Sequence, residues 1–291
     1  MSEALYRYAI LLLKLFLDRR PFRGAAEFAF GISSVERDYC RFRISSREGG
    51  FRRTVALRRR TSDLATFQQV FANNEYNLRR LRRWDEISKL YDALCKNGTP
   101  LILDLGANIG LSALYFAKNW PAAHIIAVEP DKENFLMMEE NLGGLRNVLA
   151  VNAAVASEDG AVRIVDPGAS FWALRTELAL PGAADTVPAM SIESLIKLAP
   201  PNCRPFIAKI DIEGFESELF SKNTDWVKSF PIIIIELHDW LLPGQGTSNN
   251  FLRSVAPQAR DFVFIGENIV SISNTSLTGQ PAVGSTVEHV F

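Results

Sequence analysis

Four ionisable side chains stand at the ends of two apolar runs in the second half of the sequence. The runs cover residues 206–210 and 231–237. The four candidate catalytic residues are Asp211, Glu213, Glu236 and His238. Residues two apart in a strand point to the same side, and α/β sheets bind ligands beyond the carboxyl ends of their parallel strands. We therefore expect both pairs to converge on one site.

A glycine-containing turn follows the apolar run at residues 101–105. Its candidate cofactor-binding residues are Gly106, Ala107, Asn108 and Gly110. Asn108 and Leu111 occupy positions where a dinucleotide-binding turn needs glycine, and the lysine of a phosphate-binding loop is missing. Asp104, just before the turn, would repel a pyrophosphate but attract an ammonium or sulfonium group. The spacing therefore favours a cationic cofactor such as S-adenosylmethionine.

Two further segments belong to the predicted cofactor site. The second expected strand, at residues 125–128, ends at Glu129 and Pro130, where an acidic side chain can accept hydrogen bonds from both ribose hydroxyls. A third expected strand, at 147–155, places Asn152 and Ala153 near the adenine ring, with Asn152 available for its edge. In the alternative interpretation, Asp104 and Glu129 only cap the helices that follow.

Three segments together carry a resemblance to a known family: DLGANIGLSALYFA, AVEPDKENF and KIDIEGFESELF. They resemble the FkbM family of S-adenosylmethionine-dependent methyltransferases, over about residues 61–272. The resemblance implies an α/β fold of the class I methyltransferase (Rossmann-like) type, with a doubly wound, mostly parallel sheet. It also implies O-methylation of a hydroxyl group on a sugar, glycan, polyketide or related small molecule. The block TSDLATFQQVFANNEY resembles the family region that closes over the cofactor, which makes Glu75 and Tyr76 cofactor candidates, although Tyr76 fits a packing role equally well.

Methyl transfer to a hydroxyl requires alignment of the acceptor and removal of its proton. We expect His238 to act as the general base, because its usual pKa lies near neutrality, and Asp211 or Glu236 to orient it. The rival mechanism uses a divalent cation, which the four candidate catalytic residues would bind to lower the pKa of the hydroxyl. Of the two mechanisms we predict the one with His238 as base, and we therefore assign no metal ligand from the sequence.

Other functions stay open at this stage. A nicotinamide oxidoreductase would share the sheet, but the glycine spacing opposes it. N-methylation and a non-catalytic Rossmann-like binding protein are the further alternatives, although a binding protein would not need the complete ionisable cluster.

The sequence predicts two parts: a basic N-terminal extension over residues 1–95 and a methyltransferase domain over residues 96–291. The extension should hold a β-hairpin within residues 39–57 that extends or covers the edge of the sheet, because apolar and polar residues alternate on both sides of Gly49 and Gly50. Helices are predicted at 64–71, with an N-cap from residues 61–63, and at 81–94. Another helix should begin at Ser191 and continue to Leu198.

Composition indicates an ordinary globular protein of 291 residues with 47% hydrophobic and 22% charged residues. The three cysteines form no C-x-x-C pair, which predicts neither disulfides nor zinc and favours the cytoplasm. The net charge of −1 conceals an asymmetry, because residues 1–100 hold 20 Lys and Arg against 11 Asp and Glu. This basic part is either a solvated face or a surface for an anionic partner such as a membrane, whereas nucleic acid is not expected.

Residues 4–17 form an apolar segment that is too short, and too interrupted by Arg7 and Lys14, to span a bilayer. We expect either a helix packed on the body or on a second copy in a homodimer, or an interfacial helix in peripheral contact with the inner membrane. A second segment, 167–180, contains Phe171 and Trp172 and is expected to form a wall of the acceptor site.

Overall fold

The computed structural model describes residues 27–165, 175–178 and 186–275. The expectations for residues 4–17 and for Phe171 and Trp172 lie outside the described residues. Within the described part, no helix has the length and apolar character needed to cross a membrane.

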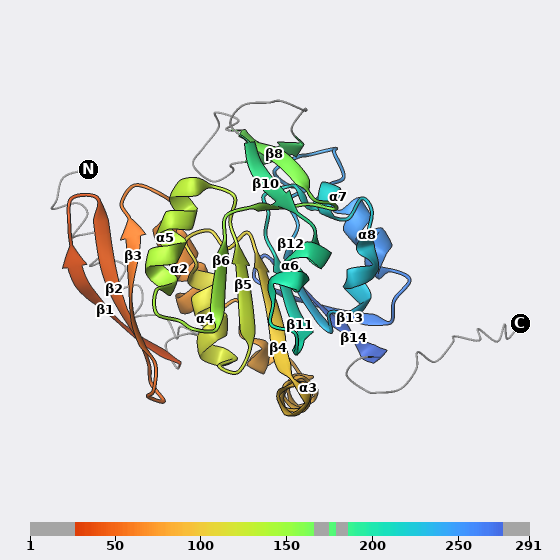
Figure 1. The fold of residues 1–291 in the computed structure, drawn as a ribbon. Coiled ribbons are helices and arrows are strands. Elements are labelled where there is room, and N and C mark those ends of the chain that lie inside the picture. Colours follow the sequence, from red (N-terminus) through yellow and green to blue (C-terminus); the bar gives the residue numbers. More distant parts are fainter. Residues whose placement is uncertain (1–26, 166–174, 179–185, 276–291) are drawn as a thin grey trace, which may run out of the picture.

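A seven-stranded sheet forms the centre of the molecule, in the order β13-β14-β12-β11-β4-β5-β6 (Figure 1). Its parallel strands are β4 (Thr99–Leu105), β5 (His124–Val128), β6 (Val148–Val151), β11 (Cys203–Ile210) and β12 (Ile232–Glu236). The antiparallel hairpin of β13 (Arg260–Ile265) and β14 (Asn268–Ser273) completes one edge through β14. The predicted doubly wound, mostly parallel α/β sheet is confirmed.

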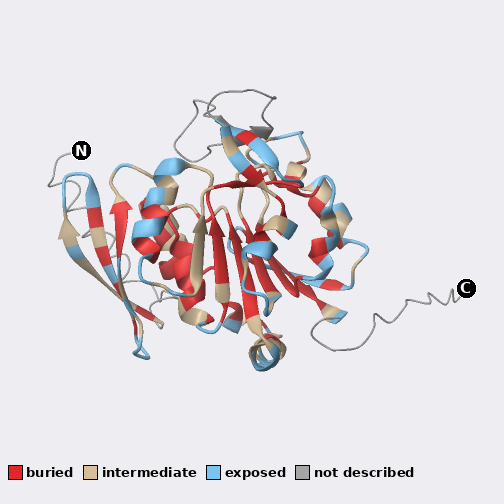
Figure 2. Cartoon of the chain, in the orientation of Figure 1, coloured by how far each residue is buried: buried red, intermediate tan, exposed pale blue. Residues whose placement is uncertain are grey.

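Helices cover both faces of this sheet, because its central strands are apolar on both sides (Figure 2). One apolar cluster joins the sheet to α3 (Trp84–Asn97), α4 (Leu111–Asn119) and α5 (Lys132–Leu142). The other joins it to α6 (Ile192–Leu198), α7 (Glu216–Leu219), the 3₁₀ segment η3 (Thr224–Lys228) and α8 (Asn249–Val255). Helix α6 begins as predicted, since the Ser191 side chain accepts a hydrogen bond from the Ser194 amide.

The N-terminal part forms a separate antiparallel sheet of β1 (Phe28–Val35), β2 (Tyr39–Ser46) and β3 (Arg52–Arg58). The predicted hairpin is present as β2 and β3, but it does not extend the central sheet. Strand β3 packs against α5 instead. The buried Asn141 side chain of α5 fixes this contact, accepting from the Ala56 amide at 2.7 Å and donating to the Ala56 carbonyl at 3.2 Å.

The segment between this sheet and the core contains α2 (Asp63–Phe67), the π-helical turn η1 (Gln68–Ala72) and the 3₁₀ turn η2 (Leu78–Arg80). The predicted helix at 64–71 is therefore present, although its second half is π-helical. At its start Thr61 Oγ1 accepts a hydrogen bond from the Asp63 amide at 3.3 Å, whereas the Ser62 side chain makes no cap bond. The buried Asp63 carboxylate pairs with Arg58 at 2.9 Å, which ties the helix to β3.

The third predicted strand is shorter than expected, because the chain leaves the central sheet after Val151. The next residues, β7 (Ala154–Val155), join β8 (Gly160–Val165), β9 (Arg175–Leu178) and β10 (Thr186–Met190) in a second sheet, ordered β7-β10-β8-β9. Asn152 holds the turn between the two sheets, since its side-chain amide donates to the Glu129 and Pro130 carbonyls at 2.9 and 3.0 Å. The described strands of this sheet lie beyond the carboxyl ends of the central strands (Figure 1).

Candidate active site

A cavity of about 720 Å³ lies at the carboxyl ends of β4, β5, β11 and β12. The predicted cofactor residues that line it are Tyr76, Gly106, Ala107, Asn108, Glu129 and Pro130. The four predicted catalytic residues also line it: Asp211, Glu213, Glu236 and His238. Segments that are distant in the sequence thus meet around one space, as expected for the point where strand order reverses in a doubly wound sheet.

The glycine turn lies against the end of β11. Gly106 has a φ of +76°, and a Cβ atom built on it would stand 1.7 Å from the Asp211 carbonyl oxygen. The Asp211 amide donates to the Leu105 carbonyl at 3.0 Å, which holds the two strand ends together. Glycine at position 106 is therefore required by both its backbone conformation and the close approach of β11.

Glu129 connects the glycine turn to the start of α5. One carboxylate oxygen accepts from the Asn108 amide at 2.8 Å and the other from the Asp131 amide at 2.9 Å. The residue is only 6% exposed, and burial raises its pKa to about 7 despite these hydrogen bonds. Glu129 is thereby held in one orientation at the cavity wall.

Asp104 is fully buried and is not among the residues lining the cavity. It accepts a hydrogen bond from Ser112 Oγ at 2.6 Å and pairs with Lys209 Nζ at 3.3 Å. Lys209 also donates to the Gly106 carbonyl at 2.6 Å and stands 3.5 Å from Asp211. Burial lowers the pKa of Lys209, but the charges of Asp104 and Asp211 outweigh it, so that the net pKa lies above its usual value. The positive charge that pairs with Asp104 in the structure is therefore the ammonium group of Lys209, whereas the sequence suggested a cationic cofactor for this position.

Four other predicted cofactor residues also lie outside the cavity lining, and one of them is Glu75, whose buried carboxylate accepts hydrogen bonds from the side chains of Asn73 and Asn268. Asn152 donates its amide hydrogens to backbone carbonyls, Ala153 is buried, and Gly110 packs against Met138 and Leu142 of α5.

Tyr76 combines the two roles that the sequence left open, a place at the cofactor cavity and packing in the core. Its ring lines the cavity and also packs on Phe116, with 5.4 Å between ring centroids.

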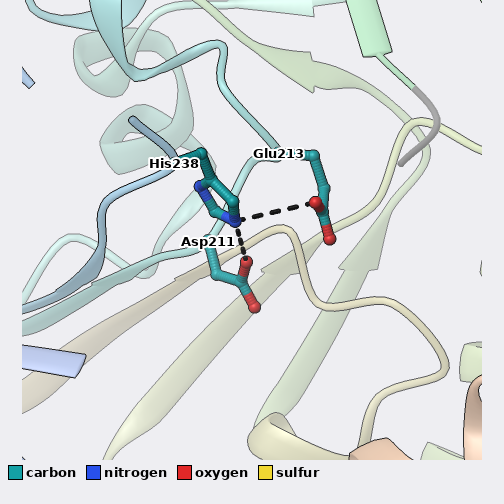
Figure 3. A group of neighbouring side chains, drawn as sticks. All are labelled: Asp211, Glu213 and His238. Carbon is teal, nitrogen blue, oxygen red and sulfur yellow. Dashed lines mark ion pairs between the residues drawn. The ribbon is translucent and has the colours of Figure 1, made fainter. Parts of the chain in front are cut away.

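The carboxylates of the predicted catalytic cluster face one nitrogen of His238, and Figure 3 shows two of them, those of Asp211 and Glu213. Nε2 lies 3.7 Å from an Asp211 oxygen, 3.6 Å from a Glu213 oxygen and 3.6 Å from a Glu236 oxygen. The imidazole is only 1% exposed, whereas Glu213 is 37% exposed at the mouth of the cluster. The convergence predicted from strand spacing is present.

The residue that orients His238 is one the sequence reasoning missed. Nδ1 of His238 lies 3.0 Å from Oε1 of Glu216, a fully buried residue at the start of α7. The expectation that Asp211 or Glu236 would orient the ring is therefore wrong, because both face the other nitrogen. In the sequence, the one indication of a role for Glu216 is its position within the block KIDIEGFESELF, which carries part of the family resemblance.

Burial and mutual repulsion shift the pKa values of this cluster. Burial lowers the pKa of His238, but the hydrogen bond and charge of Glu216, followed by the charges of Asp211 and Glu213, raise it to about 9. Burial and then the charge of Asp211 raise the pKa of Glu213 to about 8 and that of Glu236 to about 7. The carboxylates outnumber the cations around them, so the site attracts positive charge.

Two sequence comparisons match known proteins. A family model described as the methyltransferase FkbM domain matches residues 104–264. Methyltransferase sdnD of Sordaria araneosa is 36% identical over 73 residues, which cover 24% of this chain and only 28% of that protein.

Two solved structures are remotely similar to this chain. The O-methyltransferase from Bacillus cereus, in complex with SAH, is 13% identical with a TM-score of 0.37, over 72% of this chain and 90% of that one. The O-methyltransferase TomG from Streptomyces achromogenes, in complex with SAM, is 13% identical with a TM-score of 0.37, over 72% of this chain and 89% of that one.

Proposed function

The chain belongs to the family of FkbM methyltransferases, and from this premise we propose that it transfers the methyl group of S-adenosylmethionine to a hydroxyl group of a small-molecule or glycan acceptor. One observation carries the proposal: the glycine turn, Glu129 and the four predicted catalytic residues line the same cavity. A volume of about 720 Å³ lies within the range of cofactor and substrate pockets.

The residues present fit the cofactor. Glu129 is fixed by two backbone amides, and its carboxylate can accept hydrogen bonds from ribose hydroxyls. The negative cluster around His238 suits a positively charged sulfonium. S-adenosylmethionine supplies an electrophilic methyl group, and the protein aligns the acceptor with it.

The acceptor hydroxyl must lose its proton as the new bond forms. His238 and Glu236 are the candidate proton acceptors, since both line the cavity and their side chains lie 3.6 Å apart. His238 can accept a proton only in its neutral form, which its pKa of about 9 makes the minor form at neutral pH. Glu216 acts on His238 as a positioning residue through the hydrogen bond to Nδ1.

An amine acceptor is the second candidate. The carboxylates of Asp211, Glu213 and Glu236 would bind a protonated amine as readily as a sulfonium, because each is an acceptor of charge-assisted hydrogen bonds. The identity of the methylated atom therefore distinguishes N-methylation from O-methylation.

The test uses S-adenosylmethionine with a deuterated methyl group. The protein is incubated with small-molecule and glycan fractions of a cell extract, and products are analysed by mass spectrometry for the labelled methyl group and its position. We expect methyl ethers, together with S-adenosylhomocysteine in equal amount, from the wild type but not from the Asp211→Asn variant. Label on nitrogen would replace O-methylation by N-methylation, and cofactor binding without transfer to any fraction would favour a binding protein.

The cytoplasmic location, the membrane contact of residues 4–17 and the homodimer stay predictions. Flotation with anionic liposomes, comparing the full chain with a chain that begins at Arg23, separates the membrane contact from a packing role.

A further inference from the structure

We propose that Asp211, Glu213 and His238 form a binding site for one divalent cation of the Mg²⁺ or Mn²⁺ type. The proposal deepens the proposed function, on which it rests only for what the cation does in the reaction. The binding of the cation can be measured without any acceptor or any turnover.

The geometry brings one ligand atom from each residue into a single small volume. The three atoms lie within 4.8 Å of one another, and they converge from the ends of β11 and β12 (Figure 3). His238 Nε2 stands 3.7 Å from Asp211 and 3.6 Å from Glu213. Ligands about 2.1 Å from a cation lie about 3 Å apart, so side-chain shifts of up to about one ångström would close the site.

An independent observation concerns the nitrogen that faces this volume. The His238 side chain is 1% exposed, yet the carboxylate oxygens that face its Nε2 stand 3.6–3.7 Å away, beyond hydrogen-bond distance, and no hydrogen bond to Nε2 is found within the described part of the chain. Nδ1 is occupied by Glu216, which can only accept when ionised, so Nδ1 is the donor. In the neutral form of the imidazole, the form in which histidine binds a metal, the lone pair of Nε2 then points into the cavity. Metal-bound histidines have this arrangement, with the second nitrogen donating to a carboxylate.

The charges around the volume also favour a cation. Three carboxylates, those of Asp211, Glu213 and Glu236, surround Nε2. The buried ammonium nearest to them is that of Lys209, which stands 3.5 Å from Asp211 and is shared with Asp104 at 3.3 Å. When His238 is neutral, as a metal ligand must be, this one shared positive charge leaves the carboxylates with a negative excess that a divalent cation would offset.

The donor set indicates which kind of cation fits. Two carboxylates and one imidazole suit Mg²⁺ or Mn²⁺, with water or an acceptor oxygen completing the coordination. A hydroxyl bound there would ionise more readily. Its oxygen then forms the bond to the methyl carbon, the carbon–sulfur bond breaks with its electron pair on sulfur, and the proton passes to the Glu236 carboxylate.

The experiment titrates metal-stripped, full-length protein with Mn²⁺ alone and follows free Mn²⁺ by electron paramagnetic resonance. We expect one Mn²⁺ per chain, displaced by Mg²⁺, and an affinity at least about tenfold lower in Asp211→Asn and His238→Ala. The matched control is Glu267→Gln, which removes an exposed carboxylate at the same cavity, outside the proposed ligand set, and should bind Mn²⁺ like the wild type.

The variant Glu213→Gln guards against misfolding of the more buried variants, because Glu213 is 37% exposed and its replacement keeps the shape of the side chain. Loss of Mn²⁺ binding in this folded variant supports the proposal. Absence of binding in the wild type, or wild-type affinity in all three ligand variants, overturns it. S-adenosylmethionine binding is measured by calorimetry in the same samples. Cofactor binding without Mn²⁺ binding would refute the cation site and leave the proposed function standing, whereas Mn²⁺ binding without methyl transfer to any acceptor would do the reverse.

Discussion

Replacing Glu129 by glutamine tests the cofactor assignment with the smallest change in shape. In the wild type both oxygens accept from backbone amides, those of Asn108 and Asp131. Glutamine offers one carbonyl oxygen and one amide group, so one of these N–H donors would face another donor. The variant also loses the charge that strengthens hydrogen bonds from the ribose hydroxyls. We therefore expect Glu129→Gln to weaken S-adenosylmethionine binding nearly as much as Glu129→Ala.

The expected magnitude follows from the number of bonds lost. Two charge-assisted hydrogen bonds to ribose, partly replaced by water, should cost about 1.5–3 kcal/mol of binding free energy in total. This cost corresponds to a dissociation constant about ten to a hundred times higher. Glu133→Gln is the matched control, because Glu133 is exposed at the same cavity wall.

The pH dependence gives a second readout of the same residue. Burial raises the pKa of Glu129 to about 7, so below that pH the carboxyl group becomes protonated and neutral. Ribose binding favours the ionised form, so affinity should fall as the pH falls, with a dissociation constant about tenfold higher at pH 6 than at pH 8. The same change should be absent from Glu129→Gln, once effects common to both proteins are subtracted.

Isothermal titration calorimetry at pH 6 and pH 8 measures both effects. Equal dissociation constants for the wild type and Glu129→Gln at pH 8 would refute the ribose assignment. Parallel pH profiles for the two proteins would show that another group causes the pH dependence.

Two further substitutions test the support beneath the site by chemical denaturation. Gly244→Ala should lower the free energy of unfolding by about 1–2 kcal/mol, because alanine is strained at the positive φ of this residue. Gly106→Ala should lower it by clearly more, because Gly106 also has a positive φ and its added Cβ atom would clash with backbone atoms, whereas that of Gly244 would meet nothing. Equal losses in the two variants would contradict the close-approach argument. Lys209→Met should cost about 3–5 kcal/mol, since it leaves Asp104 and Asp211 without their shared cation, and a variant as stable as the wild type would show that the pair is not coupled to folding.

The sequence by itself determined the central sheet and the place of the candidate site. Short apolar runs predict buried strands, and the carboxyl ends of parallel strands meet at one edge of a sheet. That local rule was enough to bring Asp211, Glu213, Glu236 and His238 together. It also placed Glu129 beside the glycine turn, since both follow neighbouring strands.

Only the tertiary structure decided which partner each side chain takes. Strand spacing gives the face on which a residue lies, but a hydrogen bond depends on shifts of an ångström between separate elements. Glu216 of α7 orients His238, and Lys209 of β11 forms an ion pair with the carboxylate of Asp104. The position of the N-terminal sheet was likewise out of reach, because its packing on α5 depends on the contact between Asn141 and β3, which are far apart in the sequence. Periodicity specifies elements and faces, whereas the pairing of buried polar groups is fixed when those elements pack against one another.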